Sequence, residues 1–527
     1  MSPRAWSAAC AATVFFYLVH VWWLAGVAED AFISFRYARH LAEGLGLVWN
    51  PGEAPVEGYT NFLWVLLTSV FVRLDWDVPR AAQLTGALAG LGTLAYTGLV
   101  ARSLGWKWHW ALVPTGLLAM TGPFAAWSGA GLETLAFTAF VFAALYHAAG
   151  WARDGNGSDR LMLMLVLLLA SLTRPEGLLV AGVLLPIAAS LGLRGRRSQL
   201  ATSAAVLALV YATYFVWRWH YFGYLLPNTF YAKTGGGLLQ AERGAGYVGS
   251  FLLHYAAPWL PALVLTGWSA RVWLHFGPRD PFFVLASTFI IVWLGYVVVI
   301  GGDYMAMYRF IVPALPALTF MLACGVRSLI RSAHHGSEGL RAAAVATLAV
   351  GVLGTLLQST PFEAFVFEVP PRMHGNYRGI ETERWHVARL TRIAEMFARR
   401  AETRSDSVAT DAIGAIGWFS GLHVHGAHGL VDPQIAHQSA SAHDVGDDYA
   451  GHDRRDLWRL FEKQPTYFMF TRELRDTKPD VIEVPDTYAA AVAAGYRLQS
   501  VWIEDPENAE SGWFSFLEQS EAGGSNR

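Results

Sequence analysis

Two adjacent acids follow directly after the first long apolar stretch of the chain. The stretch ends near residue 27, and Glu29 and Asp30 come next. Ionisable groups at membrane depth are costly and usually serve a functional site. A carboxylate there can take a proton from a hydroxyl and act as a general base. Capping of the following helix is the alternative, and the adjoining second acid and arginines weigh against it. We therefore predict Asp30 and Glu29 as catalytic residues.

Four further polar clusters interrupt later apolar stretches. They read SGAGLE at 128–133, TRPEG at 173–177, YFGYLLPNTFYAK at 221–233 and GGDYMAMYR at 301–309. Arginine forks and lysine point charges suit phosphate, so Arg174, Lys233 and Arg309 are the predicted phosphate ligands. Lipid headgroup contacts, local ion pairs and a belt of interfacial tyrosines are the alternatives. The predicted substrate-binding residues are Arg36, Glu57, Tyr59, Glu133, Arg174, Glu176, His220, Asn228, Lys233, Asp303 and Arg309.

The segment after the acids is expected to position them. Residues 31–43 have the pattern of a surface helix, with Phe32 and Phe35 on a face toward lipid or core and Arg36 on a polar face. Gly44 and Gly46 end this helix. A loop rich in proline and glycine follows and carries Glu57. The apolar run at 61–74 is only about 14 residues long, which favours a re-entrant or interfacial helix.

The composition divides the chain in two. Of 527 residues, 54% are hydrophobic and 15% are charged, against about a quarter charged in a soluble protein. The deficit lies in residues 5–360. We therefore predict a membrane domain at 1–360, with an outer catalytic loop at 28–80, and a soluble domain at 361–527. The net charge of −2 argues against a nucleic-acid binder.

The apolar runs predict about eleven membrane helices, since a span needs roughly 20 apolar residues. The predicted spans are 6–27, 81–101, 108–123, 131–149, 161–173, 177–193, 200–219, 256–275, 281–300, 308–328 and 342–359. Breaks are expected at Gly122-Pro123 and Arg174-Pro175. With the N-terminus in the cytoplasm, the inside loops carry most arginines, as the positive-inside rule requires. The polar clusters and the C-terminal domain then share the outer side, provided that 61–74 does not cross.

The C-terminal domain is expected to be a small α/β unit. A helix is predicted at 383–402 and strands at 407–410, 466–470, 497–502 and 513–517. His423, His425 and His428 could hold a metal, but alternation in a strand also explains the first two. Cys10 and Cys324 fall in apolar runs and are interpreted as packing residues. The sequence shows no motif for a soluble nucleotide-sugar donor.

These segments together resemble a known family. The run EDAFISFRYARHLAEGLGLVWNPGEAPVEGYTNFLW, with GLE, TRPEG, LPNTFYAK and GGDYMAMYRFIVPALP, is similar to GT-C membrane glycosyltransferases. It most resembles the actinobacterial arabinofuranosyltransferases that add terminal β-1,2-linked residues to arabinan. The tail segment VATDAIGAIGWFSGLHVHGAHGLVD resembles a segment of related enzymes. The family's acidic pair, commonly two aspartates, matches Glu29 and Asp30 here.

The resemblance implies an inverting glycosyltransferase of the GT-C fold. It would transfer a pentose, D-arabinofuranose, from a polyprenyl-phosphate donor to an envelope glycan on the outer face of the bacterial inner membrane. No cofactor is required because a lipid phosphate is a good leaving group, although a divalent metal is not excluded. The alternatives are a lipid-linked hexose or aminoarabinose transferase acting on lipid A, glycan or a protein such as pilin, and a lipid or sugar transporter.

Overall fold

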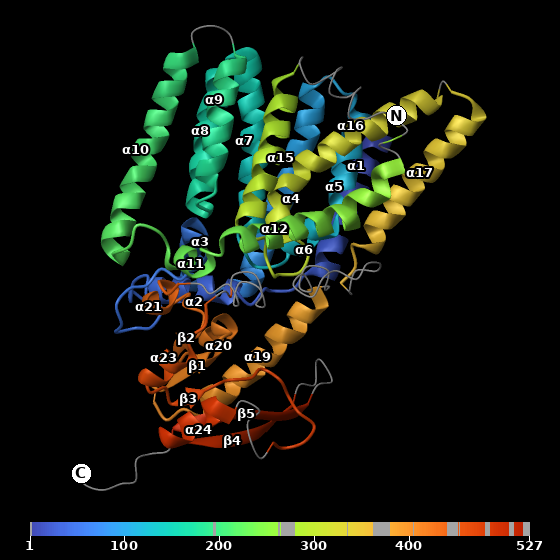
Figure 1. The fold of residues 1–527 in the computed structure, drawn as a ribbon. Coiled ribbons are helices and arrows are strands. Elements are labelled where there is room, and N and C mark those ends of the chain that lie inside the picture. The colour runs from blue at the N-terminus through green and yellow to red at the C-terminus, as the bar shows by residue number, and fades with distance from the viewer. Residues whose placement is uncertain are drawn as a thin grey trace.

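The computed structural model describes residues 3–192, 196–261, 264, 280–334, 336–361, 380–403, 405–439, 452, 454–479, 485–504 and 511–519. A group of long helices forms the N-terminal part, and residues 380–519 form a smaller part at one end of these helices (Figure 1). We call the helix end that faces this smaller part the domain end, and the opposite end the far end. The predicted division at residue 360 adjoins residues 362–379, which lie outside the described part, and it stays a prediction.

The helices of the N-terminal part follow the apolar runs. They are α1 (Pro3–Leu24), α2 (Ala31–Ala42), α3 (Phe62–Arg73), α4 (Val78–Ser103), α5 (Trp108–Ala119), α6 (Gly122–Ser128), α7 (Thr134–Asp154), α8 (Gly157–Thr173), α9 (Gly177–Leu191), α10 (Arg196–Phe222), α11 (Asn228–Lys233), α12 (Gly237–Phe251), η1 (Leu252–Ala256), η2 (Ala257–Trp259), α15 (Pro281–Val299), η3 (Arg309–Ala314), α16 (Leu315–His334) and α17 (Glu338–Leu357). The predicted breaks at Gly122-Pro123 and Arg174-Pro175 separate α5 from α6 and α8 from α9, because proline cannot donate the next helical hydrogen bond.

Among the described residues, seven helices are long and apolar enough to cross a membrane. They are α1, α4, α7, α10, α15, α17 and the continuous segment Arg309–His334. Helices α5, α8 and α9 are shorter, and they stand in the same layer in Figure 1. The remaining predicted span, at 256–275, lies largely outside the described residues. The protein is therefore a multi-pass membrane protein of mostly helical fold, as the sequence predicted.

Helix α3 does not cross the layer, as its length predicted. At its start, Asn61 donates a hydrogen bond to Glu133 at the domain end. After its last residue, Asp75 and Asp77 line a cavity together with Arg384 and Trp418 of the C-terminal part. Both ends of this 12-residue helix therefore lie on the same side, and α4 starts from the domain end.

The far end carries arginines from several loops. Arg153 at the end of α7 forms an ion pair of 2.8 Å with Asp280, which precedes α15. Because α10 ends beside Glu57 at the domain end, the chain changes ends between α10 and α15. The end of α7 and the start of α15 therefore lie at the far end, as the predicted order of membrane crossings requires. Arg194, Arg271 and Arg279, also predicted for the far loops, lie outside the described residues.

The C-terminal part is an α/β unit around a five-stranded sheet. Its elements are α19 (Ile380–Arg400), β1 (Ser407–Thr410), α20 (Ile413–Ser420), β2 (His423–Gly426), α21 (Pro433–Ala436), α23 (Leu457–Glu462), β3 (Tyr467–Phe468), α24 (Pro485–Ala493), β4 (Tyr496–Ile503) and β5 (Gly512–Gln519). The strand order is β2-β1-β3-β5-β4. Strand β1 runs parallel to β2 and β3, whereas β5 is antiparallel to β3 and β4. The predicted helix and strands are confirmed, and His423 and His425 alternate along β2.

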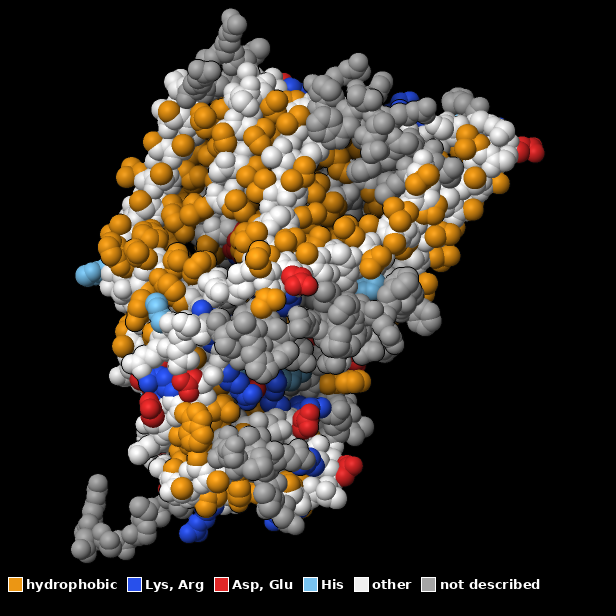
Figure 2. All heavy atoms as spheres, in the orientation of Figure 1, with side chains coloured by type: hydrophobic (Ala, Val, Ile, Leu, Met, Phe, Trp, Pro, Cys, Tyr) orange, Lys and Arg blue, Asp and Glu red, His pale blue; other side chains and the backbone are white. Residues whose placement is uncertain are grey.

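The surface reflects the same division. Figure 2 shows apolar side chains spread over the outer faces of the long helices, whereas charged side chains gather over the C-terminal part. The outward residues of α10 include Leu209, which is 72% exposed, and Val216, which is 58% exposed. An apolar side chain exposed on this scale along a whole helix is explained by contact with lipid. On the same face a hollow opens beside α10 at the level of α11, with an acidic side chain visible inside it (Figure 2).

Candidate active site

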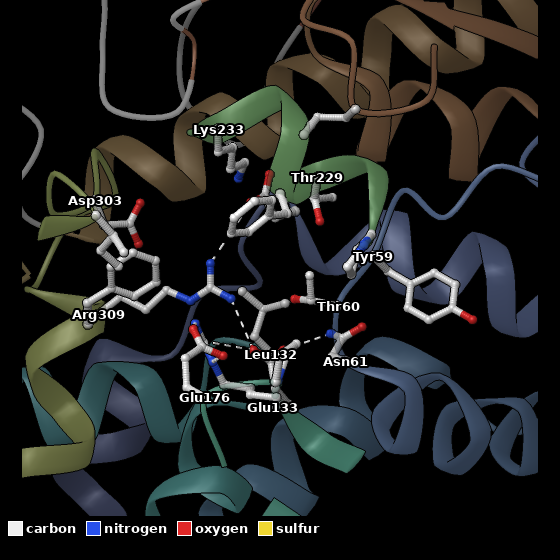
Figure 3. Close-up of a pocket in the computed structure, with 18 of the residues that line it drawn as sticks. Tyr59, Thr60, Asn61, Leu132, Glu133, Glu176, Thr229, Lys233, Asp303 and Arg309 are labelled. Carbon is white, nitrogen blue, oxygen red and sulfur yellow. Dashed lines mark hydrogen bonds and ion pairs between the residues drawn. The ribbon is translucent and has the colours of Figure 1, made fainter. Parts of the chain in front are cut away.

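A cavity of about 490 Å³ lies at the domain end, between α2, the start of α7, α9, α11 and α15 (Figure 3). It contains side chains from all five polar clusters that the sequence singled out. The predicted residues that line it are Asp30, Tyr59, Glu133, Arg174, Glu176, Lys233, Asp303 and Arg309. The convergence expected from the topology is therefore found in the structure. Figure 3 shows one exception in orientation, because the Tyr59 ring points away from the cavity.

Glu133 is the centre of a buried charge network on the cavity floor. One carboxylate oxygen lies 3.2 Å from both Arg174 and Arg309, and the other accepts a 2.7 Å hydrogen bond from Asn61. Burial raises the pKa of Glu133, but the two guanidinium groups outweigh burial and hold this pKa below its ordinary value. Glu133 is therefore an anion that holds two cations at the cavity.

Arg174 is shared between two acids. It also lies 2.8 Å from Glu176, which in turn accepts a 3.0 Å hydrogen bond from Tyr296 of α15. The two acids therefore take up much of the hydrogen-bonding capacity of the Arg174 guanidinium within the protein. Arg174 consequently serves to order the floor, and the cations with more freedom to meet a ligand are Arg309 and Lys233.

Asp30 lies at the edge of this network. It occupies the N-cap position of α2, but its side chain makes no capping hydrogen bond. The same holds for Glu133 at the start of α7 and Glu176 at the start of α9. The capping alternative is therefore not supported for these three acids. Instead, the Asp30 carboxylate faces the cavity with one oxygen 4.0 Å from Arg309.

Lys233 supplies a cation from the opposite wall. It ends the short helix α11, and Figure 3 shows its ammonium group pointing into the cavity. No ion pair or side-chain hydrogen bond joins this ammonium to another residue of the described part of the chain. The neighbouring Thr229 hydroxyl is buried and also has no hydrogen-bond partner there. Both groups are suited to oxygen atoms of a ligand.

Asp303 reaches the cavity from the loop that follows α15. Gly301 and Gly302 precede it with φ angles of +87° and +72°, a conformation that favours glycine. A Cβ on Gly302 would lie 2.7 Å from the Tyr247 side chain. This tight turn brings Asp303, and Arg309 further along the same loop, to the cavity wall.

Glu29 faces away from this first cavity. Its carboxylate accepts a 3.0 Å hydrogen bond from the backbone N–H of Ala415 in α20, and its own N–H donates to Glu383 of α19 at 2.8 Å. It lines a second cavity, between the helices and the C-terminal part. The two predicted catalytic acids thus point to different places, and only Asp30 reaches the first cavity.

The burial of Glu29 predicts a pH-dependent stability. Burial, and then the neighbouring Asp30, raise the pKa of Glu29 to about 8. A folded-state pKa above the unfolded value means that stability is full at low pH and is lost as pH rises through about 8. Each unit of pKa shift corresponds to about 1.4 kcal/mol. We expect the thermal unfolding midpoint in detergent to fall between the ordinary glutamate pKa of 4.5 and about pH 8, and to fall less in Glu29→Gln.

Glutamine keeps the acceptor for Ala415 and removes the titration, so it separates charge from contact. Glu43→Gln is the matched control, because Glu43 is exposed at the end of α2. Equal pH slopes in the wild type and Glu29→Gln would contradict the assigned environment of Glu29.

Arg36 lies elsewhere than the sequence predicted. It is buried and lines neither cavity. Its guanidinium donates to Trp49 O at 2.9 Å, to Asn50 at 3.1 Å and to Leu422 O at 2.8 Å. The expected substrate contact is therefore corrected to a structural one. The polar face of α2 is covered by the C-terminal part, and Arg36 joins the two.

Three other predicted substrate residues also lie outside the first cavity lining. Glu57 forms a buried ion pair with Arg218 of α10, with one N–O distance of 3.0 Å. Asn228 donates to the carbonyl oxygens of Gly429 and Leu430 and so fixes α11 to the C-terminal part. His220 is exposed on α10. These residues position the wall or face away, in place of the predicted substrate contact.

Several residues of the site were not predicted. Asn61 anchors Glu133, Arg218 pairs with Glu57, and Glu383 meets Glu29. A signal existed for Arg218, because an arginine near the end of an apolar run needs a partner. Glu383 had no comparable signal, since it lies in an ordinary amphipathic helix of the C-terminal part.

The chain is similar to two curated proteins named terminal beta-(1->2)-arabinofuranosyltransferase. That of Mycobacterium tuberculosis is 27% identical over 257 residues, which cover 46% of this chain and 40% of the relative. That of Corynebacterium glutamicum is 26% identical over 338 residues, which cover 56% and 48%. The chain thus spans less than half the length of these relatives.

Solved structures identify the fold. ArnT from Cupriavidus metallidurans, solved bound to undecaprenyl phosphate, matches with a TM-score of 0.60 and 12% identity over 100% of both chains. The archaeal oligosaccharyltransferase AglB from Archaeoglobus fulgidus, in complex with an inhibitory peptide and a dolichol-phosphate, matches with a TM-score of 0.52 and 12% identity. That second match covers 99% of this chain and 75% of AglB. The chain has the GT-C fold.

Within this GT-C chain, residues 376–517 match a family model described as a domain of unknown function, DUF8728. The matched range contains the helix α19 that carries Glu383 and the sheet β2-β1-β3-β5-β4. The C-terminal part therefore corresponds to a recurring unit whose role the family description leaves open.

Proposed function

We propose that this GT-C protein is an inverting glycosyltransferase that moves a pentose, D-arabinofuranose, from a polyprenyl-phosphate donor to a glycan of the cell envelope. One observation carries the proposal. A single cavity presents the carboxylate of Asp30 beside the cations Arg309 and Lys233, at the membrane edge of a GT-C fold. The curated relatives, which are named as arabinofuranosyltransferases, support the pentose.

The reaction would need one proton acceptor and one phosphate site. The acceptor hydroxyl attacks the anomeric carbon on the face opposite the lipid phosphate, and its proton goes to Asp30. A carbon–oxygen bond forms to the acceptor, and the bond from the anomeric carbon to the phosphate oxygen breaks. The electron pair leaves with the polyprenyl phosphate, whose charge Arg309 and Lys233 stabilise. No cofactor takes part in this scheme.

The apolar side of the cavity suits the lipid part of such a donor. Leu226 and Phe230 line the cavity and are 39% and 46% exposed, so the cavity meets the surface there. Leu179 of α9 and Ile300 after α15 line the same space. The hollow beside α10 in Figure 2 opens on a face where apolar side chains cover the long helices. A prenyl chain could therefore enter from the bilayer.

In the proposed orientation, the site would act on the outer face of the bacterial inner membrane. The N-terminus would be cytoplasmic, and the domain end with the C-terminal part would be extracytoplasmic. The arginines of the far end support this orientation through the positive-inside rule.

Replacing Lys233 with methionine is expected to weaken donor binding. A hydrogen bond to a charged group contributes about 1.5–3 kcal/mol, so the donor KM should rise by about 10- to 150-fold while the protein still folds. The measurement is the donor KM, together with the inhibition constant of undecaprenyl phosphate. Lys107→Met is the matched control, because Lys107 is exposed at the far end. Unchanged donor KM and inhibition in Lys233→Met would remove Lys233 from the phosphate site.

The sugar is tested by a panel of donors. Polyprenyl-phosphate arabinofuranose, mannose, glucose and aminoarabinose would each be offered to the purified protein with an arabinan-like oligosaccharide and with lipid A. Arabinose transfer to the oligosaccharide is the expected result. Transfer of aminoarabinose to lipid A would instead favour the second candidate, a lipid-linked aminoarabinose transferase.

A further inference from the structure

A second cavity, of about 510 Å³, lies between the N-terminal helices and the C-terminal part. Glu29, Asp30 and Tyr304 contribute from the helical side, whereas Glu383, Asp411 and Arg472 contribute from the C-terminal part. Asp30, Ile33 and Leu430 line both cavities. The two spaces therefore meet at the residue proposed as the general base.

The second cavity differs from the first in the chemistry of its walls. Five carboxylates, three guanidinium groups and three imidazoles line it, and Arg472 lies 3.6 Å from Asp411. The guanidinium groups are matched by carboxylates, so the wall has no excess of positive charge that would hold an anion. Mixed donors and acceptors of this kind suit hydroxyl groups. Trp385 is 41% exposed and adds an aromatic surface, which can pack against the apolar face of a sugar ring.

Glu383 is held close to the proposed base. Its Oε1 accepts the backbone N–H of Glu29 at 2.8 Å, and Glu29 directly precedes Asp30. Its Oε2 makes no hydrogen bond within the described part of the chain. Burial, the main cause, raises the pKa of Glu383 to about 7, so near neutral pH its carboxyl exists in both forms. A hydroxyl in the second cavity can therefore donate to it or accept from it.

We propose that the second cavity binds the acceptor, that this acceptor is an uncharged polyhydroxylated glycan end, and that Glu383 and Trp385 orient its hydroxyl toward Asp30. This inference rests on the proposed glycosyl transfer. It gives the domain of unknown function at 376–517 a role, which is to form the acceptor wall. Glu383 is a positioning residue in this scheme and is unchanged by the reaction, because the proton goes to Asp30.

Two variants and one matched control test the acceptor site. Trp385→Ala removes the exposed ring, and Glu383→Ala removes the anchored carboxyl. Trp458→Ala is the control, because Trp458 is 57% exposed on the same part of the protein and lines neither cavity. Trp385→Ala is expected to raise the acceptor KM at least tenfold with the donor KM unchanged. Glu383→Ala is expected to lower kcat and to flatten the pH profile of kcat near pH 7.

A binding measurement separates this inference from the proposed function. Saturation-transfer NMR would follow an uncharged arabino-oligosaccharide, and the same oligosaccharide carrying a phosphate, on the full-length protein without donor. Loss of uncharged-oligosaccharide binding in Trp385→Ala, and weaker binding of the phosphorylated form to the wild type, are expected. Equal binding by wild type and Trp385→Ala, or tighter binding of the phosphorylated form, would overturn the inference. A wild type that binds the glycan but transfers nothing would instead count against the proposed function.

Discussion

Replacing Asp30 with asparagine is expected to lower the rate of sugar transfer by about 10²- to 10⁴-fold, the range usual for loss of a general base. The carboxylate faces the first cavity 4.0 Å from Arg309 and also lines the second cavity. Asparagine keeps the shape and cannot take the proton. The measurement is kcat with saturating donor and acceptor. Because the Asp30 side chain does not cap α2, the fold should be little affected.

Asp154→Asn is the control for this substitution, because Asp154 is exposed at the far end of α7. Its turnover should match that of the wild type. An Asp30→Asn protein with a wild-type unfolding midpoint and near-normal kcat would show that another group accepts the proton. Glu29 is the less suited replacement, since its carboxylate is bound to the N–H of Ala415.

Removal of Glu133 is expected to have the largest effect on stability. Glu133 is 1% exposed and touches Arg174, Arg309 and Asn61. Deleting one partner of a buried ion pair leaves charge without compensation and costs about 3–5 kcal/mol. Glu133→Ala should therefore lower the free energy of unfolding in mixed micelles by about that amount, and it should also lower kcat because Arg309 loses its anchor.

The matched control is Glu43→Ala, which removes an exposed acid at the end of α2 and should change stability by less than about 0.5 kcal/mol. Glu133→Gln keeps an acceptor for Asn61 and most of the volume. Its free energy of unfolding should lie between that of the wild type and that of Glu133→Ala. A wild-type unfolding free energy in Glu133→Ala would mean that Arg174 and Arg309 are not held by this acid.

The sequence predicted those site residues whose charged side chains are costly to bury beside the membrane. Asp30, Glu133, Arg174 and Arg309 all stand out as charges at the ends of apolar runs, and all four line one cavity. The non-crossing of α3 also followed from its length and from the distribution of arginines. These are local properties of the sequence, because the membrane imposes length and charge on each segment.

The rest depended on contacts between distant segments. Arg36 has the pattern of an exposed polar face, but α20 and the loop before β2 cover that face and take its hydrogen bonds. Glu383 lies 354 residues after Glu29 and meets it across the interface of the two parts. No local pattern encodes such a pairing. The sequence predicted one catalytic pair, whereas docking of the C-terminal part turns Glu29 and Asp30 toward different partners.

The donor proposed for the first cavity is a polyprenyl-phosphate pentose, whose anomeric centre would be inverted on transfer. The most direct measurement is transfer by the purified protein in nanodiscs from polyprenyl-phosphate arabinofuranose to an arabinan-like oligosaccharide, with the anomeric configuration of the product read by NMR. We expect an arabinosylated product whose anomeric configuration is opposite to that of the donor, and no product from Asp30→Asn. Retained configuration, or no transfer from any pentose or hexose donor by a folded wild-type protein, would contradict this proposal.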